Sequence, residues 1–380
     1  MNTISIKNAK DDREFVGFKV KENDIQLSFP IGYDIQENEF NIENKEKIEE
    51  IKKDIKNLMK VLEENEDYYY DKGDIKFGFS SAIFIIENYL KYGMYTGNNE
   101  LYNINGNGKI AWKETLNRIE PILSRNNYFY NNFYTIKKQT YETKITKIHK
   151  YCLNVSLKVL GWMYNIKHEE KINRPFDDDE MIYELTQELY KINEDRKKQI
   201  LKEMIYFIKG TNSSKILNNN EFAIGRNYFD KVWEGILRKQ IYKQYDEFEC
   251  YPNTYYYSNK TGEKEYNSNL YPDIVIKKDK TIVIIDAKYY KAGQKPPSSD
   301  ICKQIFYERY IQSNNRKYDI KNIFVLPKKL PNEKIEKYGY ASAEGLENKS
   351  KIDVYYVNTK SVMENNEIIK QLIEKVLHKN

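Results

Sequence analysis

The stretch that decides the fold is Tyr271–Ile276 (YPDIVI), followed a few residues later by Ile282–Lys288 (IVIIDAK). Both runs are rich in β-branched residues and are bounded by turn-forming residues, so they predict two strands joined as a hairpin. Acidic residues and a lysine stand among the apolar ones, close to one end of each run. This hairpin is therefore the first candidate for a functional site.

The register of the hairpin decides which charged residues meet. If Asp279–Lys280 is a two-residue turn, Asp273 lies directly across from Asp286. Lys288 shares a face with Asp286, because side chains alternate along a strand. The sequence predicts that two carboxylates and one ammonium come together at one end of the hairpin. The alternative is a surface hairpin that carries these charges without a function.

Two carboxylates opposed across a pair of strands repel each other unless something compensates their charge. A divalent cation compensates most strongly. Oxygen ligands from Asp273 and Asp286, with no His or Cys in either strand, favour Mg²⁺, or Mn²⁺ as a substitute, over Zn²⁺. Such an ion polarises a phosphate and lowers the pKa of a bound water. Lys288 would position or help activate that water.

Composition excludes several other classes of protein. The 62 basic and 57 acidic residues leave a net charge of only +5. Three cysteines and three histidines, all far apart, argue against a disulfide scaffold, a zinc ribbon and histidine-based catalysis, and they fit a reducing cytoplasm. No apolar run reaches the roughly 20 residues of a membrane span. A P-loop is absent, because Ile110 follows Gly108-Lys109.

The polar segment Thr211–Asn220 (TNSSKILNNN) predicts a linker and the main domain boundary. Residues 1–215 are expected to form a mainly helical region for DNA recognition or partner docking, and residues 216–380 the catalytic domain. The expected fold class is mixed α/β (α+β), with a central mixed sheet flanked by helices. Periodicity predicts helices at residues 44–64, 80–94, 112–123, 148–162, 179–192, 195–210, 228–244, 299–312 and 364–378. Strands are expected within the first 35 residues and at residues 271–277, 281–289, 321–327 and 352–357.

The pair Pro272-Asp273, followed by Asp286-Ala287-Lys288, resembles the PD-(D/E)XK nuclease signature. A preceding amphipathic helix carries Phe229–Glu234 (FDKVWE), where such nucleases often place an acidic residue that faces the metal. Glu234 is the candidate, and Asp230 one turn earlier is the alternative. The resemblance implies a restriction-endonuclease-like core around the hairpin.

The helix after the hairpin carries Gln304 and Tyr307, which are three residues apart and share a face. They resemble a glutamine–tyrosine motif of the same superfamily, although that motif usually has a spacing of four. Gln304 is alternatively a plain polar residue of the helix surface. Together with a late Gly339–Ala341 (GYA), these motifs resemble the LlaJI-type restriction endonucleases, which are relatives of the McrC nuclease subunit. Gly108–Thr115 (GKIAWKET) extends the resemblance into the first half of the chain.

The resemblance implies a Mg²⁺-dependent endonuclease that cleaves double-stranded DNA at a specific sequence in defence against foreign DNA. Asp273 and Asp286 would hold the metal, Glu234 would support it, Lys288 would assist the attacking water, and Gln304 would orient the site. Cutting both strands with one site per chain favours a homodimer or a second catalytic event. The alternative is a McrC-like subunit that is active only with an AAA+ NTPase partner. A non-catalytic DNA-binding module is disfavoured, because every expected catalytic position is filled.

Residues 101–165 form a basic, aromatic-rich region with 10 basic and 3 acidic side chains. Lysines there can contact phosphates, and aromatic rings can stack on exposed bases. A partly buried aromatic layer on a basic surface is the alternative. The acidic run Asp177–Glu180 precedes a helix, where it is expected to cap rather than to bind metal. The candidate DNA-binding residues are Lys137, Lys138, Lys144, Lys147, Tyr130 and Tyr134.

Overall fold

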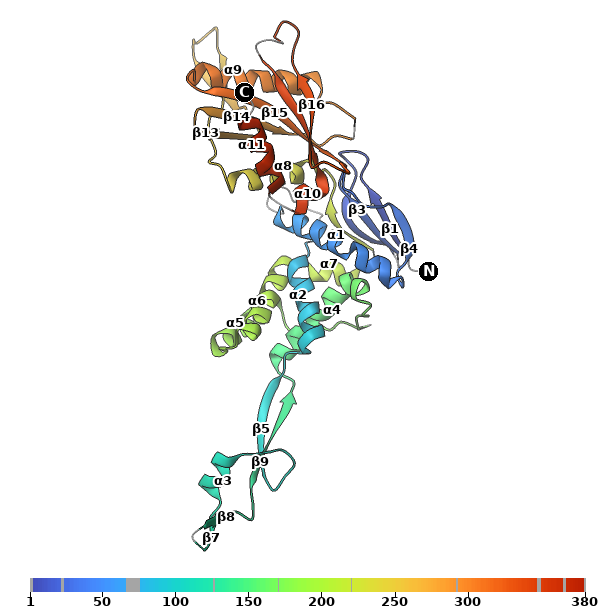
Figure 1. Ribbon diagram of the computed structural model, residues 1–380, viewed down its shortest axis with the longest axis vertical. Coiled ribbons are helices and arrows are strands. Elements are labelled where there is room, and N and C mark those ends of the chain that lie inside the picture. The colour runs from blue at the N-terminus through green and yellow to red at the C-terminus, as the bar shows by residue number, and fades with distance from the viewer. Residues whose placement is uncertain are drawn as a thin grey trace. The chain divides into compact units, whose positions relative to one another are not determined.

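The computed structural model describes residues 3–21, 24–65, 76–125, 127–169, 171–219, 221–291, 293–346, 350–364 and 367–378. It divides into two compact units (Figure 1): unit 1 is Met1–Phe77 together with Ser214–Asn380, and unit 2 is Gly78–Ser213. The division near residue 214 lies inside the expected linker. The first 77 residues differ from the expectation, because they pack with the C-terminal part instead of with a helical N-terminal region.

A mixed five-stranded sheet forms the centre of unit 1. Its strand order is β13-β14-β15-β17-β16, with β14, β15 and β17 parallel to one another and both edge strands antiparallel. The mixed α/β class predicted from the sequence is confirmed. The strands are β13 Ile274–Lys278, β14 Thr281–Ala287, β15 Asp319–Lys328, β16 Ile335–Ala341 and β17 Ile352–Asn358.

Helices pack against this sheet on both faces. One face of β14 presents Ile282 and Ile284 to α9 (Ser298–Asn314), where they pack with Tyr307 and Ile311. The alternating residues of β14 face the other way, and Tyr289 beyond the strand meets Phe229 beside α8 (Asp230–Tyr242) at 5.4 Å between ring centroids. Asp286 and Lys288 have the parity of Ile284, so they lie on the α9 face. The remaining helices of this part are α10 Thr359–Glu364 and α11 Glu367–Leu377.

A second five-stranded sheet, ordered β10-β2-β3-β1-β4, joins the N-terminal segment of unit 1 to the segment that follows unit 2. Its strand β10 comes from beyond unit 2 and pairs with β2, which explains why residues 1–77 belong with the C-terminal part. Buried hydrogen bonds also link the parts: Tyr289 accepts from the Ile31 N–H at 2.7 Å, and Thr359 donates to the Ile31 carbonyl at 2.9 Å. The elements are β1 Thr3–Asn8, β2 Val16–Lys21, β3 Asp24–Phe29, β4 Asn38–Asn41, β10 Phe222–Arg226 and the helix α1 Lys45–Glu64.

Unit 2 contains a helical core and a long, largely exposed arm at residues 97–141. The expected helix at residues 112–123 ends at Arg118, ahead of Pro121, and the expected linker contains a short helix, α7 (Ser213–Asn218), at the junction with unit 1. The helices are α2 Phe79–Tyr92, α3 Trp112–Arg118, α4 Lys144–Tyr164, α5 Asp178–Lys191 and α6 Asp195–Gly210. The arm strands are β5 Gly97–Ile104, β6 Lys109–Ile110, β7 Ile122–Ser124, β8 Asn127–Phe129 and β9 Tyr134–Tyr141.

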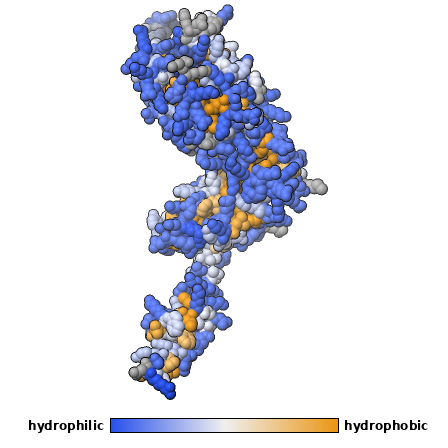
Figure 2. Space-filling view, in the orientation of Figure 1, coloured by the Kyte–Doolittle hydropathy of each residue, from blue (hydrophilic) through white to orange (hydrophobic). Residues whose placement is uncertain are grey.

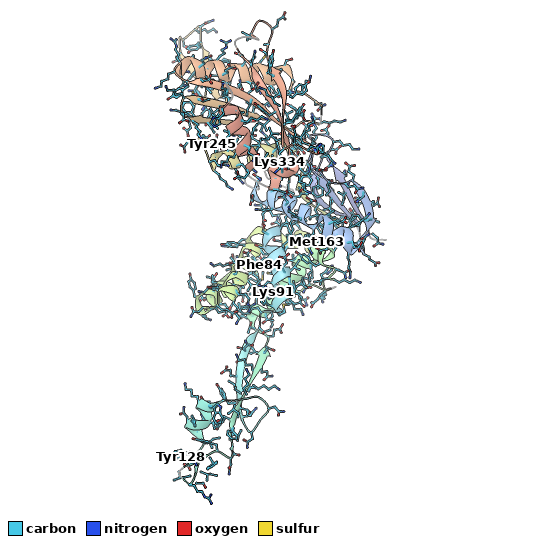
Figure 3. All side chains as sticks on the ribbon, viewed as in Figure 1. Phe84, Lys91, Tyr128, Met163, Tyr245 and Lys334 are labelled. Atoms are coloured by element: carbon cyan, nitrogen blue, oxygen red, sulfur yellow. The ribbon has the colours of Figure 1, made fainter. Side chains whose placement is uncertain are left out.

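Apolar side chains are unusually exposed on this arm. Figure 2 shows patches of hydrophobic residues on its surface, and Tyr128, labelled in Figure 3, is 71% exposed. The alternative of a partly buried aromatic layer therefore does not describe Tyr128 or Phe129, which is 51% exposed. Within the described part of the chain, every helix is too short or too polar to cross a membrane.

Candidate active site

The hairpin of β13 and β14 has the register predicted from the sequence. Ile274 pairs with Ile285 and Lys278 with Thr281, around a two-residue turn in which Asp279 has a left-handed φ of 53°. Asp273, just before β13, therefore lies beside Asp286. A hydrogen bond fixes it there, because its Oδ2 accepts from the Ala287 N–H at 2.8 Å. The local strand geometry alone thus brings the two carboxylates together.

Lys288 lies between two carboxylates. Its Nζ is 2.8 Å from Asp286 Oδ2 and 3.2 Å from Asp300 Oδ2. Asp300 is in the first turn of α9 and also accepts a 2.8 Å hydrogen bond from the Tyr290 hydroxyl. The sequence reasoning missed Asp300. The available signal was its spacing of four from Gln304, which places both residues on one face of the helix.

The electrostatics of the site follow from burial and from the crowding of acidic groups. Burial, together with the adjacent Asp286, raises the pKa of Asp273 to about 7. Burial also raises the pKa of Asp286, although the Lys288 ammonium opposes this effect. For Lys288, burial disfavours the ammonium, but Asp286 and Asp300 outweigh burial, so its pKa is raised. The positive charge of Lys288 therefore does not fully compensate the negative charges of Asp273 and Asp286.

This crowding predicts that Asp273→Asn stabilises the metal-free protein in a pH-dependent way. A carboxyl whose folded pKa lies above its ordinary value destabilises the fold once it ionises, so the cost is absent near pH 4 and complete above pH 7. A pKa of about 7 instead of 3.8 corresponds to at most about 4 kcal/mol. Because Asp273 keeps part of its surface in water, the full amount is not reached. We expect Asp273→Asn to raise the free energy of unfolding by on the order of 1–2 kcal/mol at pH 8 and by almost nothing at pH 4.

The measurement is urea unfolding in a chelator at both pH values, with the exposed Asp246→Asn as the matched control. Added Mg²⁺ should stabilise the wild type but not the variant, because a ligand that binds only the folded state raises its stability. An equal increase in the free energy of unfolding at pH 4 and pH 8 would contradict the idea that the ionised Asp273 destabilises the fold.

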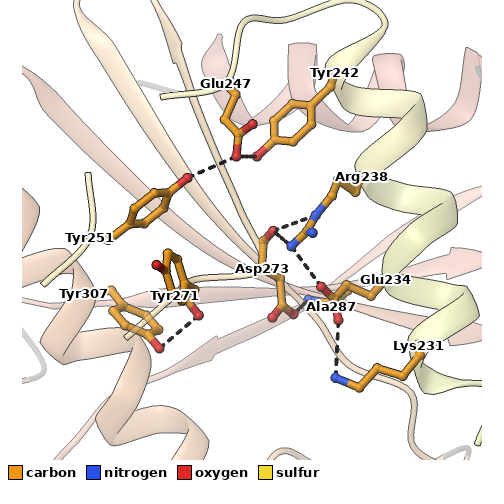
Figure 4. Close-up of polar contacts among 10 residues, drawn as sticks. All are labelled: Lys231, Glu234, Arg238, Tyr242, Glu247, Tyr251, Tyr271, Asp273, Ala287 and Tyr307. Carbon is orange, nitrogen blue, oxygen red and sulfur yellow. Dashed lines mark hydrogen bonds and ion pairs between the residues drawn. The ribbon is translucent and has the colours of Figure 1, made fainter. Parts of the chain in front are cut away.

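Glu234 lies near Asp273 but is held by cations (Figure 4). Arg238 Nη2 contacts Glu234 at 2.9 Å and also donates to the backbone oxygen of Asp273 at 2.6 Å. Lys231 Nζ is 3.7 Å from the other Glu234 oxygen. Burial, and then the charge of Asp273, raise the pKa of Glu234. The alternative residue Asp230 lies one turn earlier on α8, and its Oδ1 is buried without a hydrogen-bond partner among the described residues.

Gln304 lies on the α9 face that packs on the sheet, one turn after Asp300. Its side chain is 1% exposed, and neither amide atom has a hydrogen-bond partner within the described part of the chain. Tyr307 donates a 3.2 Å hydrogen bond to the Tyr271 carbonyl, just ahead of Asp273 (Figure 4). The helix thus presents Asp300, Gln304 and Tyr307 along the side that faces the hairpin.

The donor set fits a hard divalent cation held by two protein carboxylates. Among the described residues, no group of three or more His, Cys, Asp or Glu side chains is placed to hold a metal. Mg²⁺ is commonly bound through one or two carboxylates, with waters and substrate phosphate oxygens completing the shell. Asp273 and Asp286 fit this pattern, since their mutual repulsion is what a cation would relieve. Glu234 is engaged by Arg238 and Lys231 in this arrangement.

The structure distributes the candidate DNA-binding residues over unit 2. Lys137 and Lys138 are exposed on the arm strand β9. Tyr134 is partly buried, with the Arg118 guanidinium 5.8 Å from its ring centroid. Lys144 begins α4 and is 2.5 Å from Glu184, so it is less available for a phosphate. Tyr130 follows β8 on the same arm, and Lys147 lines a small cavity of about 230 Å³ on α4 of the helical core.

The sequence of the chain also matches known proteins. The LlaJI restriction endonuclease family matches residues 15–360, and the chain belongs to that family. The chain is also similar to the Type II restriction enzyme BsuMI component YdjA of Bacillus subtilis (strain 168), with 26% identity over 249 residues. The match covers 60% of this chain and 53% of that protein. The chain thus spans about half the length of this curated relative.

Proposed function

We propose that this protein is a Mg²⁺-dependent endodeoxyribonuclease of a restriction system that hydrolyses phosphodiester bonds of double-stranded DNA at a specific sequence. Asp273, Asp286 and Lys288 at one end of the hairpin carry the proposal. In a chain of the LlaJI restriction endonuclease family, this arrangement supports a PD-(D/E)XK site. The expected setting is the cytoplasm and the expected role is defence against foreign DNA.

Asp273 and Asp286 would hold Mg²⁺, or Mn²⁺ in its place, through their carboxylates. The ion would supply charge neutralisation at the scissile phosphate and a lower pKa for a nearby water. Lys288 donates hydrogen bonds and is anchored at 2.8 Å and 3.2 Å by its two carboxylates. It would orient the attacking water in line with the phosphorus and offset the negative charge that develops as the 3′-oxygen leaves.

Three neighbouring residues would position this machinery. Asp300 also contacts Lys288, so the ammonium would keep a partner when Asp286 engages a cation. Gln304 would orient groups in the site through its amide. A buried amide without hydrogen-bond partners costs free energy, and a functional role would explain why it is kept. Glu234 supports the site through Arg238, which reaches the backbone of Asp273.

The arm of unit 2 would bind DNA. Lys137 and Lys138 are exposed beside exposed aromatic side chains, a combination that suits phosphate contacts and base stacking. Lys147, Tyr130 and Tyr134 would add to this surface, and Lys144 would contribute only if it left Glu184. Cleavage of both strands would require a second copy of the chain or a second catalytic event.

Cleavage of supercoiled plasmid or phage DNA by the purified protein tests the proposal. We expect defined fragments with Mg²⁺ or Mn²⁺ and no cleavage when the metal is chelated. Mapping the fragment ends would give the cut positions. Metal-independent cleavage would contradict the proposed two-carboxylate site.

One observation favours a second candidate, in which the chain is a nuclease subunit of a larger enzyme. The similar Bacillus subtilis protein is itself described as a component of a restriction enzyme. On this reading the chain cleaves only with partner proteins, and an AAA+ NTPase is the partner that McrC-like nucleases use. Cleavage that requires both a co-purifying partner and an NTP would favour this candidate over the autonomous enzyme.

A further inference from the structure

A second, two-stranded hairpin leads directly into the catalytic strand. Strand β11 (Asn253–Tyr257) pairs with β12 (Lys264–Asn269), and the Leu270 N–H donates to the Pro252 carbonyl at 3.0 Å to close its base. Tyr271 follows at once, and its carbonyl is held by Tyr307 (Figure 4). The base of this hairpin therefore lies within three residues of Asp273.

The hairpin is ordered by its own contacts but is uncovered on both faces. Ser258 closes the tip by donating to the Glu263 carbonyl at 3.0 Å and accepting from the Gly262 N–H at 2.8 Å. Tyr256 is 65% exposed on one face, while Tyr257 is 68% exposed on the other. An isolated two-stranded ribbon is only marginally stable in water. Such a ribbon is expected to be completed by a binding partner.

The side chains of the hairpin indicate which partner it takes. Six of the 35 tyrosines of the chain fall within residues 251–271, whereas residues 252–269 contain no Ile, Leu, Val, Met, Phe or Trp. The other residues of 252–269 are Asn, Thr, Ser, Lys and Glu, with one Pro and one Gly. Tyrosine also occurs at protein interfaces, but the buried centre of such an interface is largely apolar, and this hairpin has no Ile, Leu, Val or Met to form one. Hydroxyl and amide groups around aromatic rings are instead suited to DNA phosphates, sugars and base edges.

We infer that the β11–β12 hairpin enters a groove of the DNA beside the scissile phosphate and contributes to recognition of the cleavage site. A two-stranded ribbon fits the major groove of B-DNA. Substrate bound at Asp273 must pass the base of the hairpin, because the chain is continuous between them. One face carries a group of side chains that could meet the duplex together. The Tyr255 and Tyr266 rings pack edge to face with their centroids 6.0 Å apart, and Lys264 Nζ is 3.5 Å from the Tyr255 ring centroid.

The charge of the hairpin makes its contribution distinguishable from that of the arm. Residues 252–269 carry two lysines and two glutamates, so their net charge is zero. Loss of a hairpin contact should weaken binding without changing its salt dependence, since that dependence reports neutralised phosphates. Loss of Lys137 or Lys138 should instead reduce the salt dependence.

The test is the double variant Tyr256→Ala/Tyr257→Ala in the full chain, once the wild type has defined a cleaved site. We expect affinity for a duplex that carries the site to fall about 10- to 100-fold. Affinity for a duplex without the site should change little, and the salt dependence should be preserved. The control is Tyr190→Ala, because Tyr190 is 81% exposed on α5 of unit 2. Tyr256→Phe/Tyr257→Phe keeps the rings, so retained binding would assign the effect to stacking.

This inference rests on the proposed nuclease function, and the two can fail separately. Normal cleavage and unchanged site preference in the double variant would overturn the hairpin inference alone. A change in oligomeric state with unchanged DNA affinity would also overturn it, by showing that the hairpin joins two chains. A wild type that neither binds nor cleaves DNA, with or without partner proteins, would overturn both. Thermal unfolding of the double variant should match the wild type, because both side chains are solvent-exposed.

Discussion

Lys288→Ala is expected to reduce the rate of DNA cleavage by about 100- to 1,000-fold. The Lys288 ammonium is held by Asp286 and Asp300 at the end of the hairpin, where charge would develop in the proposed cleavage of the phosphodiester. A preorganised donor at this point costs nothing to reorganise during the reaction, so most of its contribution appears in the transition state. The loss should therefore fall on kcat, with little change in KM.

Asp286→Asn should cause a loss at least as large, because it removes a carboxylate from the proposed metal site. Asp300→Asn should have a smaller effect, of about tenfold, since Lys288 keeps Asp286 as its partner. This graded order distinguishes residues that hold the reacting groups from one that positions them. A structural role alone would not separate kcat from KM in this way.

The measurement is the initial rate of plasmid cleavage at saturating Mg²⁺, with DNA binding measured in parallel. Lys291→Ala is the matched control, because Lys291 is exposed three residues further along the same segment. It should cleave at the wild-type rate. Cleavage that survives both Lys288→Ala and Asp286→Asn would remove the basis of the proposed site.

Trp233→Ala is expected to destabilise unit 1 by about 3–5 kcal/mol. Trp233 is 0% exposed and is among the largest fully buried side chains. It anchors α8 to the central sheet, and its Nε1 approaches the Val325 carbonyl at 3.5 Å. The same carbonyl accepts from the Lys288 N–H at 3.0 Å. Truncation would leave a cavity beside the strand that carries the site, and the surrounding sheet cannot fully collapse into it.

For a domain of this size the change corresponds to a fall in Tm of roughly 6–20 °C. Differential scanning calorimetry measures it, and the transition of unit 2 should remain in place, because unit 2 has its own buried core. Trp112→Ala is the control: Trp112 is 53% exposed on the arm, so we expect a change within about 0.5 kcal/mol. A Trp233→Ala protein that unfolds at the wild-type temperature would contradict the packing described for α8.

The sequence predicted the register of the β13–β14 hairpin correctly, because that register depends on local signals. Strand parity and a two-residue turn are enough to set Asp273 beside Asp286 and to place Lys288 on the same face. Most helices were also located, since their apolar periodicity is strong. The roles of Asp273, Asp286, Lys288, Glu234 and Gln304 remain predictions, although the structure brings the first three together and places Gln304 on the helix that faces them.

Local sequence patterns did not predict contacts between residues that are distant in the sequence. Nothing near Asp300 shows that it would contact Lys288, because the contact depends on how α9 packs on the sheet. The tyrosines of the β11–β12 hairpin look like compositional drift until the structure shows both faces of the ribbon in solvent. The same limit applies to residues 1–77, whose place in unit 1 depends on β10 crossing from beyond residue 213.

The sequence by itself therefore determined the class of fold, the register of the hairpin and the chemistry of its charged end. These follow from side-chain alternation and from the repulsion of neighbouring carboxylates. The tertiary structure decided which cations and carboxylates accompany them: Arg238 on Glu234, and Asp300 on Lys288. It also decided which aromatic side chains of the arm and of the β11–β12 hairpin remain exposed. Those outcomes depend on long-range packing of helices on sheets, and the free energy of that packing is not readable from any one segment of the chain.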